Sequence, residues 1–337
     1  MNGVDLASTA TTHGREAMTP AHPVARATND AGPRVLVTGA TGMQGGAAAL
    51  TLHQAGLNVS ALVRSPASAA ARHLAETGIA LRAGDLDDAG SLAAACAGHT
   101  TVFSVQPAPY ADPDSERRQA RNLITAALEA GVRHMVHASV SGTGWRDRHP
   151  TVAPGAAANY WDSKETVEEL VRRAGFDAYT IFKPAFYMEN FVAPKVGRMF
   201  PNLADGELLV AAPPTAELAL LASADLGNAV LAAVTDRHRF TDAEIELGGD
   251  VVTFAEISEV LTSVTGRPIS LVSLPAKEVD ARMGKRSWSA TQAWIASVGY
   301  PARPAHAAPY GLPLTTFPQW AEQHRDQLCA AFTSRGQ

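Results

Sequence analysis

A glycine-spaced segment over residues 34–46 constrains the fold more than any other part of the chain. It opens with a short apolar, β-branched run at residues 35–37, and an alanine-rich segment with high helix propensity follows at residues 47–55. Between these two segments, glycines recur at intervals of three, at Gly39, Gly42 and Gly45. A strand, a glycine turn and a helix in this order are the context of a dinucleotide-binding loop. The segment therefore predicts a nucleotide site. The alternative is a glycine-rich turn that binds nothing.

The three glycines are expected to have separate tasks in this loop. Gly39 permits the tight turn, Gly42 lets the backbone approach a pyrophosphate, and Gly45 lets the helix pack close to the strand. The free amides and the positive dipole end of the helix then face the phosphates. Three further residues complete the expected cofactor loop, namely Thr41, Met43 and Gln44.

Strands and helices alternate from Arg34 to Pro184. We expect strands over residues 35–38, 59–63, 79–82, 101–105, 135–139 and 178–182. We expect helices over residues 43–55, 65–76, 89–97, 114–130 and 160–174. Strands separated by helices of this length imply parallel βαβ units. Right-handed crossovers then build a doubly wound parallel sheet of the Rossmann type, which is an α/β fold.

The regular alternation stops after Pro184, and prolines become more frequent. Mixed segments there predict a smaller α+β carboxyl-terminal lobe, with helices over 225–235, 254–265, 276–283 and 290–298 and strands over 245–247 and 269–273. We divide the chain into a disordered tail over 1–33, an NADP-binding Rossmann domain over 34–184 and a smaller substrate-binding lobe over 185–337, some of whose elements return to the main lobe. Ligands of such folds bind outside the carboxyl ends of the strands, so this lobe is expected to form one wall of the substrate pocket.

Composition excludes several classes of protein. A formal net charge of -5 argues against a nucleic-acid-binding surface. The two cysteines, Cys96 and Cys329, cannot form a disulfide framework, and they are consistent with a reducing cytoplasm. No apolar run reaches the ~18 residues that a membrane span requires. No cluster of His, Cys or Asp has the spacing of a metal site.

The second expected strand ends at Arg64, where an NAD site usually carries Asp or Glu. A guanidinium forms charge-assisted hydrogen bonds with a 2′-phosphate, whereas a carboxylate would repel it. Arg64 therefore predicts NADP(H) over NAD(H), and the alternative is an exposed arginine at a strand end. Asp85 follows the third strand, where it either accepts a hydrogen bond from the adenine amino group or holds a turn. Gln106 follows the fourth strand and is expected to lie along the cofactor.

Tyr160 and Lys164 form a Tyr-x-x-x-Lys pair in an expected helix, and their spacing places both side chains on one face. A nearby ammonium is expected to lower the pKa of the phenol, which would make Tyr160 a proton donor. Lys164 would also hold the nicotinamide ribose. Ser139 or Ser141, at the end of the fifth strand, is expected to hold the substrate oxygen. The alternative for Tyr160 is a partly buried aromatic residue beside Trp161.

These residues together resemble the NmrA-like branch of the atypical short-chain dehydrogenase/reductases. The matching motifs lie at residues 38–46, 62–64, 84–86, 164–168, 179–190 and 223–225, within a resemblance that spans roughly residues 34–300. The resemblance implies an NADP(H)-preferring Rossmann lobe, with Leu86 and Pro184 beside the cofactor. Some members of the family reduce quinones, dyes, enones or benzylic ethers, and others bind the nucleotide without turnover as regulators. Many members lack the tyrosine, so the pair Tyr160 and Lys164 favours an enzyme. Lys183, where arginine is commoner, is a departure.

Aromatic residues near the expected cleft predict an apolar substrate. Trp145, Phe186, Tyr187 and Asn190 are expected to line the substrate pocket, and the alternative for Phe186 and Tyr187 is packing between the lobes. We therefore expect an NADPH-dependent reductase that transfers hydride to an apolar carbonyl, quinone or conjugated small molecule. The alternatives are an NADP(H)-sensing regulatory protein without turnover and a redox-neutral isomerase or dehydratase. If the chain forms a homodimer, the helix over 114–130 offers a pairing surface.

Overall fold

The structure is a computed structural model of the chain, and it describes residues 32–153, 155–284 and 288–332. The tail expected over 1–33 therefore lies outside the described residues, apart from Gly32 and Pro33. Residues Pro33–Gln337 form one compact unit. The division of this unit at residues 184 and 185 stays a prediction.

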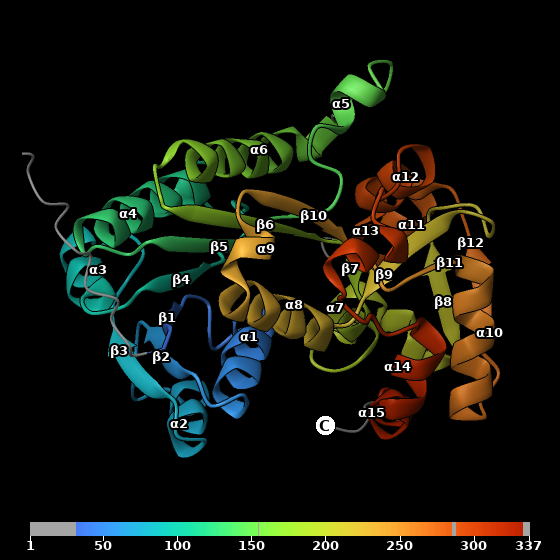
Figure 1. The fold of residues 1–337 in the computed structure, drawn as a ribbon. Helices are drawn as coiled ribbons and strands as arrows, with labels where there is room; N and C mark the ends of the chain where they lie inside the picture. Colours follow the sequence, from blue (N-terminus) through green and yellow to red (C-terminus); the bar gives the residue numbers. More distant parts are fainter. Residues whose placement is uncertain (1–31, 154, 285–287, 333–337) are drawn as a thin grey trace, which may run out of the picture. The chain divides into compact units, whose positions relative to one another are not determined.

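A seven-stranded parallel sheet forms the centre of this unit, with the strand order β10-β6-β5-β4-β1-β2-β3 (Figure 1). Its strands are β1 (Arg34–Val37), β2 (Asn58–Val63), β3 (Ala80–Ala83), β4 (Thr101–Ser104), β5 (His134–Ala138), β6 (Ala178–Pro184) and β10 (Ala243–Leu247). The central strands β1, β4 and β5 are almost entirely buried on both faces, so they lack the alternation of apolar and polar residues that a strand with one solvated face shows. The predicted doubly wound α/β fold is confirmed.

Helices cover both faces of the sheet (Figure 1). One face carries α3 (Ala89–Cys96), α4 (Ser115–Glu129) and α6 (Ala158–Arg173). The other face carries α1 (Met43–Gln54), α2 (Ala69–Glu76) and α8 (Ser223–Thr235), and the short α9 (Arg237–Phe240) leads from α8 into β10. The helix expected from residue 65 begins only at Ala69, because the Ser68 side chain caps it by accepting the Ala71 amide.

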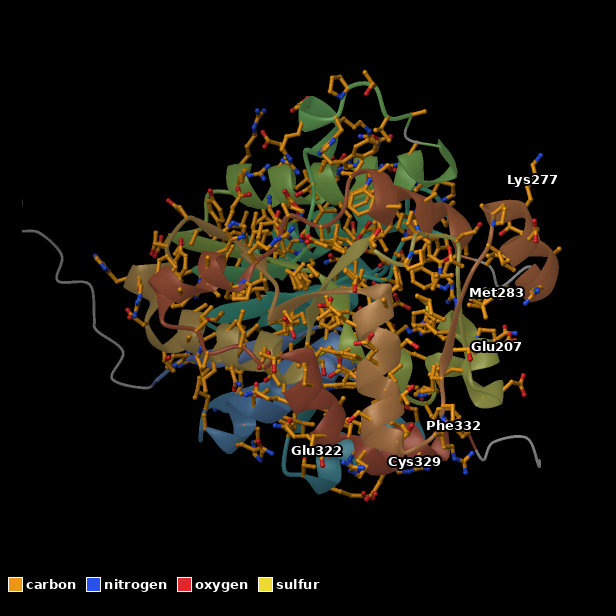
Figure 2. The ribbon with its side chains drawn as sticks, turned by 90° about the vertical axis from the view of Figure 1, so that its right-hand side faces the viewer. Glu207, Lys277, Met283, Glu322, Cys329 and Phe332 are labelled. Atoms are coloured by element: carbon orange, nitrogen blue, oxygen red, sulfur yellow. The ribbon has the colours of Figure 1, made fainter. Side chains whose placement is uncertain are left out.

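A smaller carboxyl-terminal lobe lies beyond the carboxyl ends of the central strands, as expected (Figure 1). It contains a three-stranded sheet of β7 (Phe186–Tyr187), β9 (Glu217–Leu221) and β11 (Asp250–Thr253), and a two-stranded sheet of β8 (Glu207–Val210) and β12 (Ser270–Ser273). Its longer helices are α10 (Phe254–Thr265), α11 (Ala276–Met283), α12 (Ser289–Ser297), α14 (Phe317–Gln323) and α15 (Arg325–Ala330). The short α7 (Val196–Met199) also belongs to this lobe, whereas the short α5 (Trp145–Arg148) precedes α6 and α13 (Pro304–Ala307) contacts β10 of the main sheet. Figure 2 turns this lobe toward the viewer, with Lys277 of α11 projecting from it.

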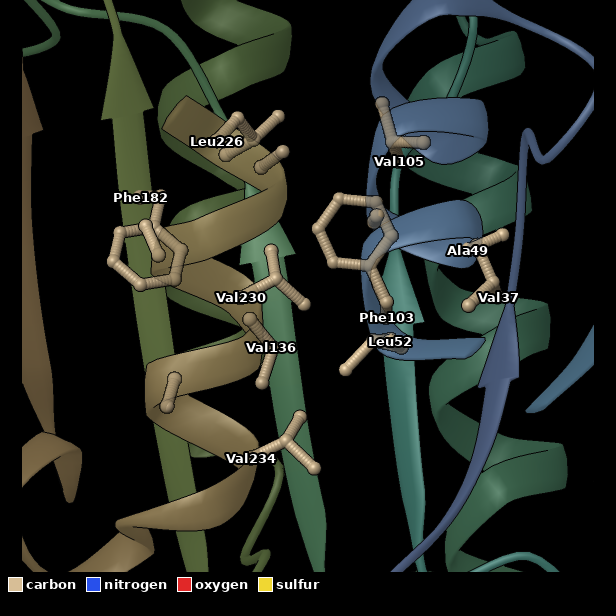
Figure 3. Packing of buried hydrophobic residues seen from close by; sticks show 14 of the residues in the cluster. Val37, Ala49, Leu52, Phe103, Val105, Val136, Phe182, Leu226, Val230 and Val234 are labelled. Atoms are coloured by element: carbon tan, nitrogen blue, oxygen red, sulfur yellow. The ribbon is translucent and has the colours of Figure 1, made fainter. Parts of the chain in front are cut away.

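Two helices from distant parts of the sequence share one face of the sheet. Leu226, Val230 and Val234 of α8 and Leu52 of α1 pack toward Phe103 and other strand side chains in one continuous core (Figure 3). The approach of α8 to α1 requires Gly227, because a Cβ atom there would lie 2.5 Å from the Thr51 hydroxyl. This packing anchors the second half of the chain to the helix that follows the glycine loop.

No helix among the described residues is both long enough and apolar enough to cross a membrane.

Candidate active site

The glycine loop between β1 and α1 has no room for side chains at two of its three glycines. Gly39 has a φ of +60°, and a Cβ atom there would lie 2.8 Å from Cγ1 of Val105. A Cβ atom on Gly45 would lie 2.3 Å from the Gly39 carbonyl oxygen. The expected turn at Gly39 and the close packing at Gly45 are therefore confirmed. The contact of Gly42 with a pyrophosphate stays a prediction.

The first turn of α1 presents unused hydrogen-bond donors. Gly42 is its N-cap residue and provides no side-chain cap. Among the described residues, no hydrogen bond uses the amides of Met43, Gln44 or Gly45. The side-chain oxygen of Gln44 is buried and also has no partner there. Free amides at the positive end of a helix fit an anionic group such as a pyrophosphate, and Thr41 is exposed beside them.

Two expected cofactor residues lie at the ends of β2 and β3. Arg64 is exposed, and no ion pair of the described residues includes it. Asp85 accepts a hydrogen bond from the Asp87 amide at 3.0 Å, which is the turn role that we gave as its alternative. The neighbouring Leu86 is half-buried, and its carbonyl oxygen accepts the Asn122 side chain. Contacts of these residues with a cofactor stay predictions.

A buried polar group lies where β4 and β5 end. The Gln106 amide donates to the Ser104 hydroxyl at 2.9 Å, while its own oxygen is buried without a partner among the described residues. The ring of His137 lies 3.3 Å from the same hydroxyl. Burial, together with the positive charge of Lys164, lowers the pKa of His137 to about 3. His137 is therefore neutral at physiological pH.

Lys164 forms a buried ion pair with Glu116. Its Nζ lies 2.6 Å from Oε1 of Glu116, and the side chains are 7% and 0% exposed. Glu116 stands in the first turn of α4, and Lys164 stands on α6, so the pair joins two neighbouring helices. The sequence analysis did not identify Glu116, because one acid near a helix start is a common pattern with no functional meaning of its own. Its full burial is visible only in the fold.

Tyr160 and Lys164 share one helix face, as the spacing predicted. Nζ of Lys164 lies 5.7 Å from the centre of the Tyr160 ring. The predicted lowering of the phenol pKa is wrong. Burial first, and then the neighbouring Tyr300, Tyr110 and Glu116, raise the pKa of Tyr160 well above its usual value. The main physical reason is burial, which disfavours the charged phenolate, and the negative charge of Glu116 adds to this effect.

Tyrosines gather around Tyr160, and four of the six in the chain belong to this group. The exposed Tyr110 stacks on Tyr160, with ring centres 6.3 Å apart and planes 6° apart. Tyr300, which packs on Trp294, and Tyr187 are close enough to influence ionisation of Tyr160. The hydroxyl of Tyr187 is buried without a hydrogen-bond partner among the described residues. The group thus offers flat rings and an unused hydroxyl on the wall expected to face the substrate.

Neither Ser139 nor Ser141, which follow β5, directs its hydroxyl proton toward the tyrosines around Tyr160. The Ser139 hydroxyl donates to Glu168 at 2.6 Å, and Glu168 also binds Arg172 and Lys183. Ser141 is fully buried, and its oxygen accepts the Ala302 amide at 3.3 Å. The expectation that Ser139 offers its proton to a substrate oxygen is therefore not met, because Glu168 takes that proton.

The other expected pocket residues are mostly packed against protein. Trp145 is fully buried, with its ring against those of Trp161 and Trp294. Phe186 stacks on Trp288, with ring centres 5.3 Å apart. The contact of Phe186 lies within the smaller lobe, so packing of Phe186 between the lobes stays a prediction. Asn190 and Pro184 are also buried, and the role of all four toward a ligand stays a prediction.

Two cavities lie elsewhere in the molecule, and one of them reaches this region only through Tyr300. One of about 260 Å³ lies in the smaller lobe between α12 and β9, and its lining includes Tyr300 and Arg303. A more open groove of about 680 Å³ lies between α4 and α6, beside Arg121 and Glu165. Neither includes Tyr160, Lys164 or the glycine loop. We place the candidate site by its chemistry, at the carboxyl ends of the strands. No group of His, Cys, Asp and Glu among the described residues could hold a metal ion.

Comparison with known proteins shows what this chain resembles. The NmrA-like family matches residues 32–292. An NAD(P)H azoreductase from Xenophilus azovorans is 28% identical over 254 residues, which cover 74% of this chain and 80% of that protein.

Two solved structures share the fold. Triphenylmethane reductase from Citrobacter sp., in complex with NADP(H), superposes with a TM-score of 0.70 at 21% identity, covering 86% of this chain and 99% of that one. An NADPH-dependent quinone oxidoreductase from Escherichia coli, in complex with NADPH, superposes with a TM-score of 0.69 at 23% identity. The match covers 86% of this chain and 99% of that one.

Proposed function

Because this chain belongs to the NmrA-like family, we propose that it is an NADPH-dependent reductase that transfers hydride to an apolar, aromatic acceptor such as a quinone or an azo compound. The observation that carries the proposal is the glycine loop, where the free amides of α1 open at the carboxyl edge of the sheet. The activities of the similar azoreductase, triphenylmethane reductase and quinone oxidoreductase support it.

The cofactor would lie across the ends of the central strands. Gly39, Thr41, Gly42, Met43, Gln44 and Gly45 would hold its pyrophosphate through the loop and the first turn of α1. Arg64 would bind the 2′-phosphate. Asp85, Leu86, Gln106 and Pro184 would line the rest of the site, and Lys164 would hold the nicotinamide ribose. When bound, NADPH supplies the hydride from C4 of its nicotinamide.

The electrostatics of Tyr160 favour acceptors that need no proton from the protein. A phenol with a raised pKa is a weaker acid and therefore a poorer general acid at neutral pH. A quinone or another conjugated acceptor can take hydride and acquire its proton from water afterwards. Tyr160 and Tyr110 would then serve mainly as flat walls for the acceptor, with Lys164 held in place by Glu116.

The experiment that tests this proposal measures oxidation of NADPH, with NADH in parallel, by the purified protein and a panel of quinones, azo dyes, enones and aryl ketones. Turnover of quinones or azo dyes with NADPH is the expected result. Gly45→Ala should abolish cofactor binding, because its Cβ atom would collide with the Gly39 carbonyl, whereas Gly197→Ala introduces no contact and serves as the control. NADPH binding without turnover of any acceptor would overturn the reductase proposal and favour a nucleotide sensor or a redox-neutral enzyme.

Three further proposals concern the whole protein. We propose a division into a nucleotide domain over 34–184 and a substrate lobe over 185–337. The free cysteines Cys96 and Cys329 fit a reducing compartment such as the cytoplasm. A homodimer that pairs through α4 would be detected by analytical ultracentrifugation.

A further inference from the structure

A lysine of the smaller lobe reaches the first turn of α1. Lys195 directly precedes α7, and its Nζ lies 3.5 Å from the sulfur of Met43. Met43 is the first residue of the helix that follows the glycine loop. The ammonium group therefore lies beside the turn whose amides have no partner, although 151 residues separate Lys195 from Gln44 in the chain.

The contacts of Lys195 do not compensate its charge. The side chain is half-buried, and among the described residues its ammonium is in no ion pair and bonds only the Met43 thioether, which is a weak acceptor. Glu189 is the nearby acid: its Oε1 accepts hydrogen bonds from the Ser223 amide and hydroxyl, and its Oε2 is buried without a hydrogen-bond partner among the described residues. Its negative charge acts on Lys195, but the two form no ion pair among the described residues. Arg198 adds a second positive charge nearby, and burial lowers the pKa of Lys195.

The surroundings of Lys195 fit an anion better than any other ligand. A half-buried ammonium gains free energy from an opposite charge, because its lost hydration is otherwise poorly replaced. The nearest backbone feature is the positive end of α1, which has the same sign and cannot compensate Lys195. An anionic group placed between them would bond the free amides of α1 and Lys195 together.

We propose that Lys195 binds the pyrophosphate of the dinucleotide, so that the smaller lobe completes the site formed by the glycine loop. This inference rests on the proposed cofactor and adds a residue that the glycine motif does not contain. The pyrophosphate is common to NADPH and NADH, so Lys195 raises affinity for both. Arg64, in contrast, distinguishes them through the 2′-phosphate.

The test compares dissociation constants of NADPH and NADH, measured by titration calorimetry, for the wild-type protein and Lys195→Met. Loss of one charge-assisted contact should weaken both dinucleotides by about ten- to a hundredfold. Lys195→Arg keeps the charge and should retain most of the affinity. Lys277→Met, which removes an exposed lysine of α11 (Figure 2), is the matched control and should change neither constant. Equal melting temperatures of the variants establish that folding is intact.

The outcomes separate this inference from the proposed function. If the wild-type protein binds NADPH and Lys195→Met leaves both constants unchanged, Lys195 is not a ligand and the inference alone is overturned. If Lys195→Met weakens NADPH alone, the lysine contacts the 2′-phosphate and the pyrophosphate assignment is wrong. If the wild-type protein binds neither dinucleotide, the proposed function falls as well.

Discussion

Lys164 and Lys195 approach the same candidate cleft from two parts of the molecule, and their surroundings differ. Lys164 comes from α6 of the Rossmann fold, and a fully buried carboxylate holds it at 2.6 Å. Lys195 comes from the smaller lobe and has only a thioether at hydrogen-bond distance among the described residues. The first cation is neutralised by the protein, while the second is not. The difference indicates that Lys164 is a cation held in a fixed ion pair with Glu116, and that the charge of Lys195 is left for a ligand.

The largest effect is expected from Glu116→Gln, which would leave Lys164 with an uncompensated buried charge. Removing one partner of a buried ion pair costs about 3–5 kcal/mol of unfolding free energy. Urea unfolding monitored by circular dichroism measures this loss. The double variant Glu116→Gln with Lys164→Met should recover part of it, because the unpaired charge is then removed.

Glu322→Gln is the matched control, because Glu322 pairs with Arg325 on the exposed surface of α14 and α15. It should leave the unfolding free energy nearly unchanged. A similar small loss in Glu116→Gln would mean that the Lys164–Glu116 pair does not form in solution.

The second prediction concerns the loss of unfolding free energy at low pH that buried His137 is expected to cause. The folded-state pKa of His137 is about 3, against about 6.5 in the unfolded chain, so between these values the unfolded state binds one more proton. Stability should therefore fall as pH falls through this window, by about 1.4 kcal/mol per pH unit for this histidine. His137→Gln should reduce the slope, whereas His73→Gln, at an exposed position, should not. An unchanged slope in His137→Gln would show that His137 is not kept neutral.

The third prediction concerns Arg64, an exposed cation that is expected to bind the 2′-phosphate. Arg64→Met should weaken NADPH binding by about tenfold through loss of one charge-assisted contact, and should leave NADH binding unchanged. Fluorescence titration with both dinucleotides measures this difference. Equal weakening of both dinucleotides would place Arg64 away from the 2′-phosphate and would remove the basis of the NADP(H) preference.

The smallest effect is expected from Tyr160→Phe. Because burial raises the pKa of Tyr160, its hydroxyl stays protonated and is a poor acid, so quinone turnover should fall by less than about threefold. Steady-state kcat with NADPH measures the effect. A loss of about a hundredfold or more would identify Tyr160 as the proton donor, and would mean that Lys164 does activate it.

The sequence predicted the sheet better than the smaller lobe, for a physical reason. A strand such as β1 is buried on both faces, and its apolar run at residues 35–37 therefore stands out before the helix that follows it. The short strands β8, β9 and β11 were missed, because each is four or five residues long and lies in a region without a regular βα alternation. Pairing between segments distant in the chain, such as β12 with β8, leaves no local pattern.

Contacts between distant segments also limited how much of the candidate active site the sequence could predict. Spacing alone placed Tyr160 and Lys164 on one helix face, because both belong to one local element. Glu116 could not be assigned to Lys164, since the two helices meet only in the folded chain. Ser139 has the position expected for a substrate-binding hydroxyl, but Glu168, one helix away, takes its proton. Lys195 reaches α1 from the other lobe, and no local motif marks it.

The measurement that tests the account most directly is the crystal structure of the complex with NADPH. The account predicts the pyrophosphate on the amides of Met43 and Gln44, with Nζ of Lys195 within about 3.2 Å of a phosphate oxygen and Lys164 still paired with Glu116. A dinucleotide bound away from the glycine loop would contradict the assigned site. A dinucleotide on the loop with Lys195 turned to solvent, or with Lys164 released from Glu116, would contradict the division of roles between the two lysines.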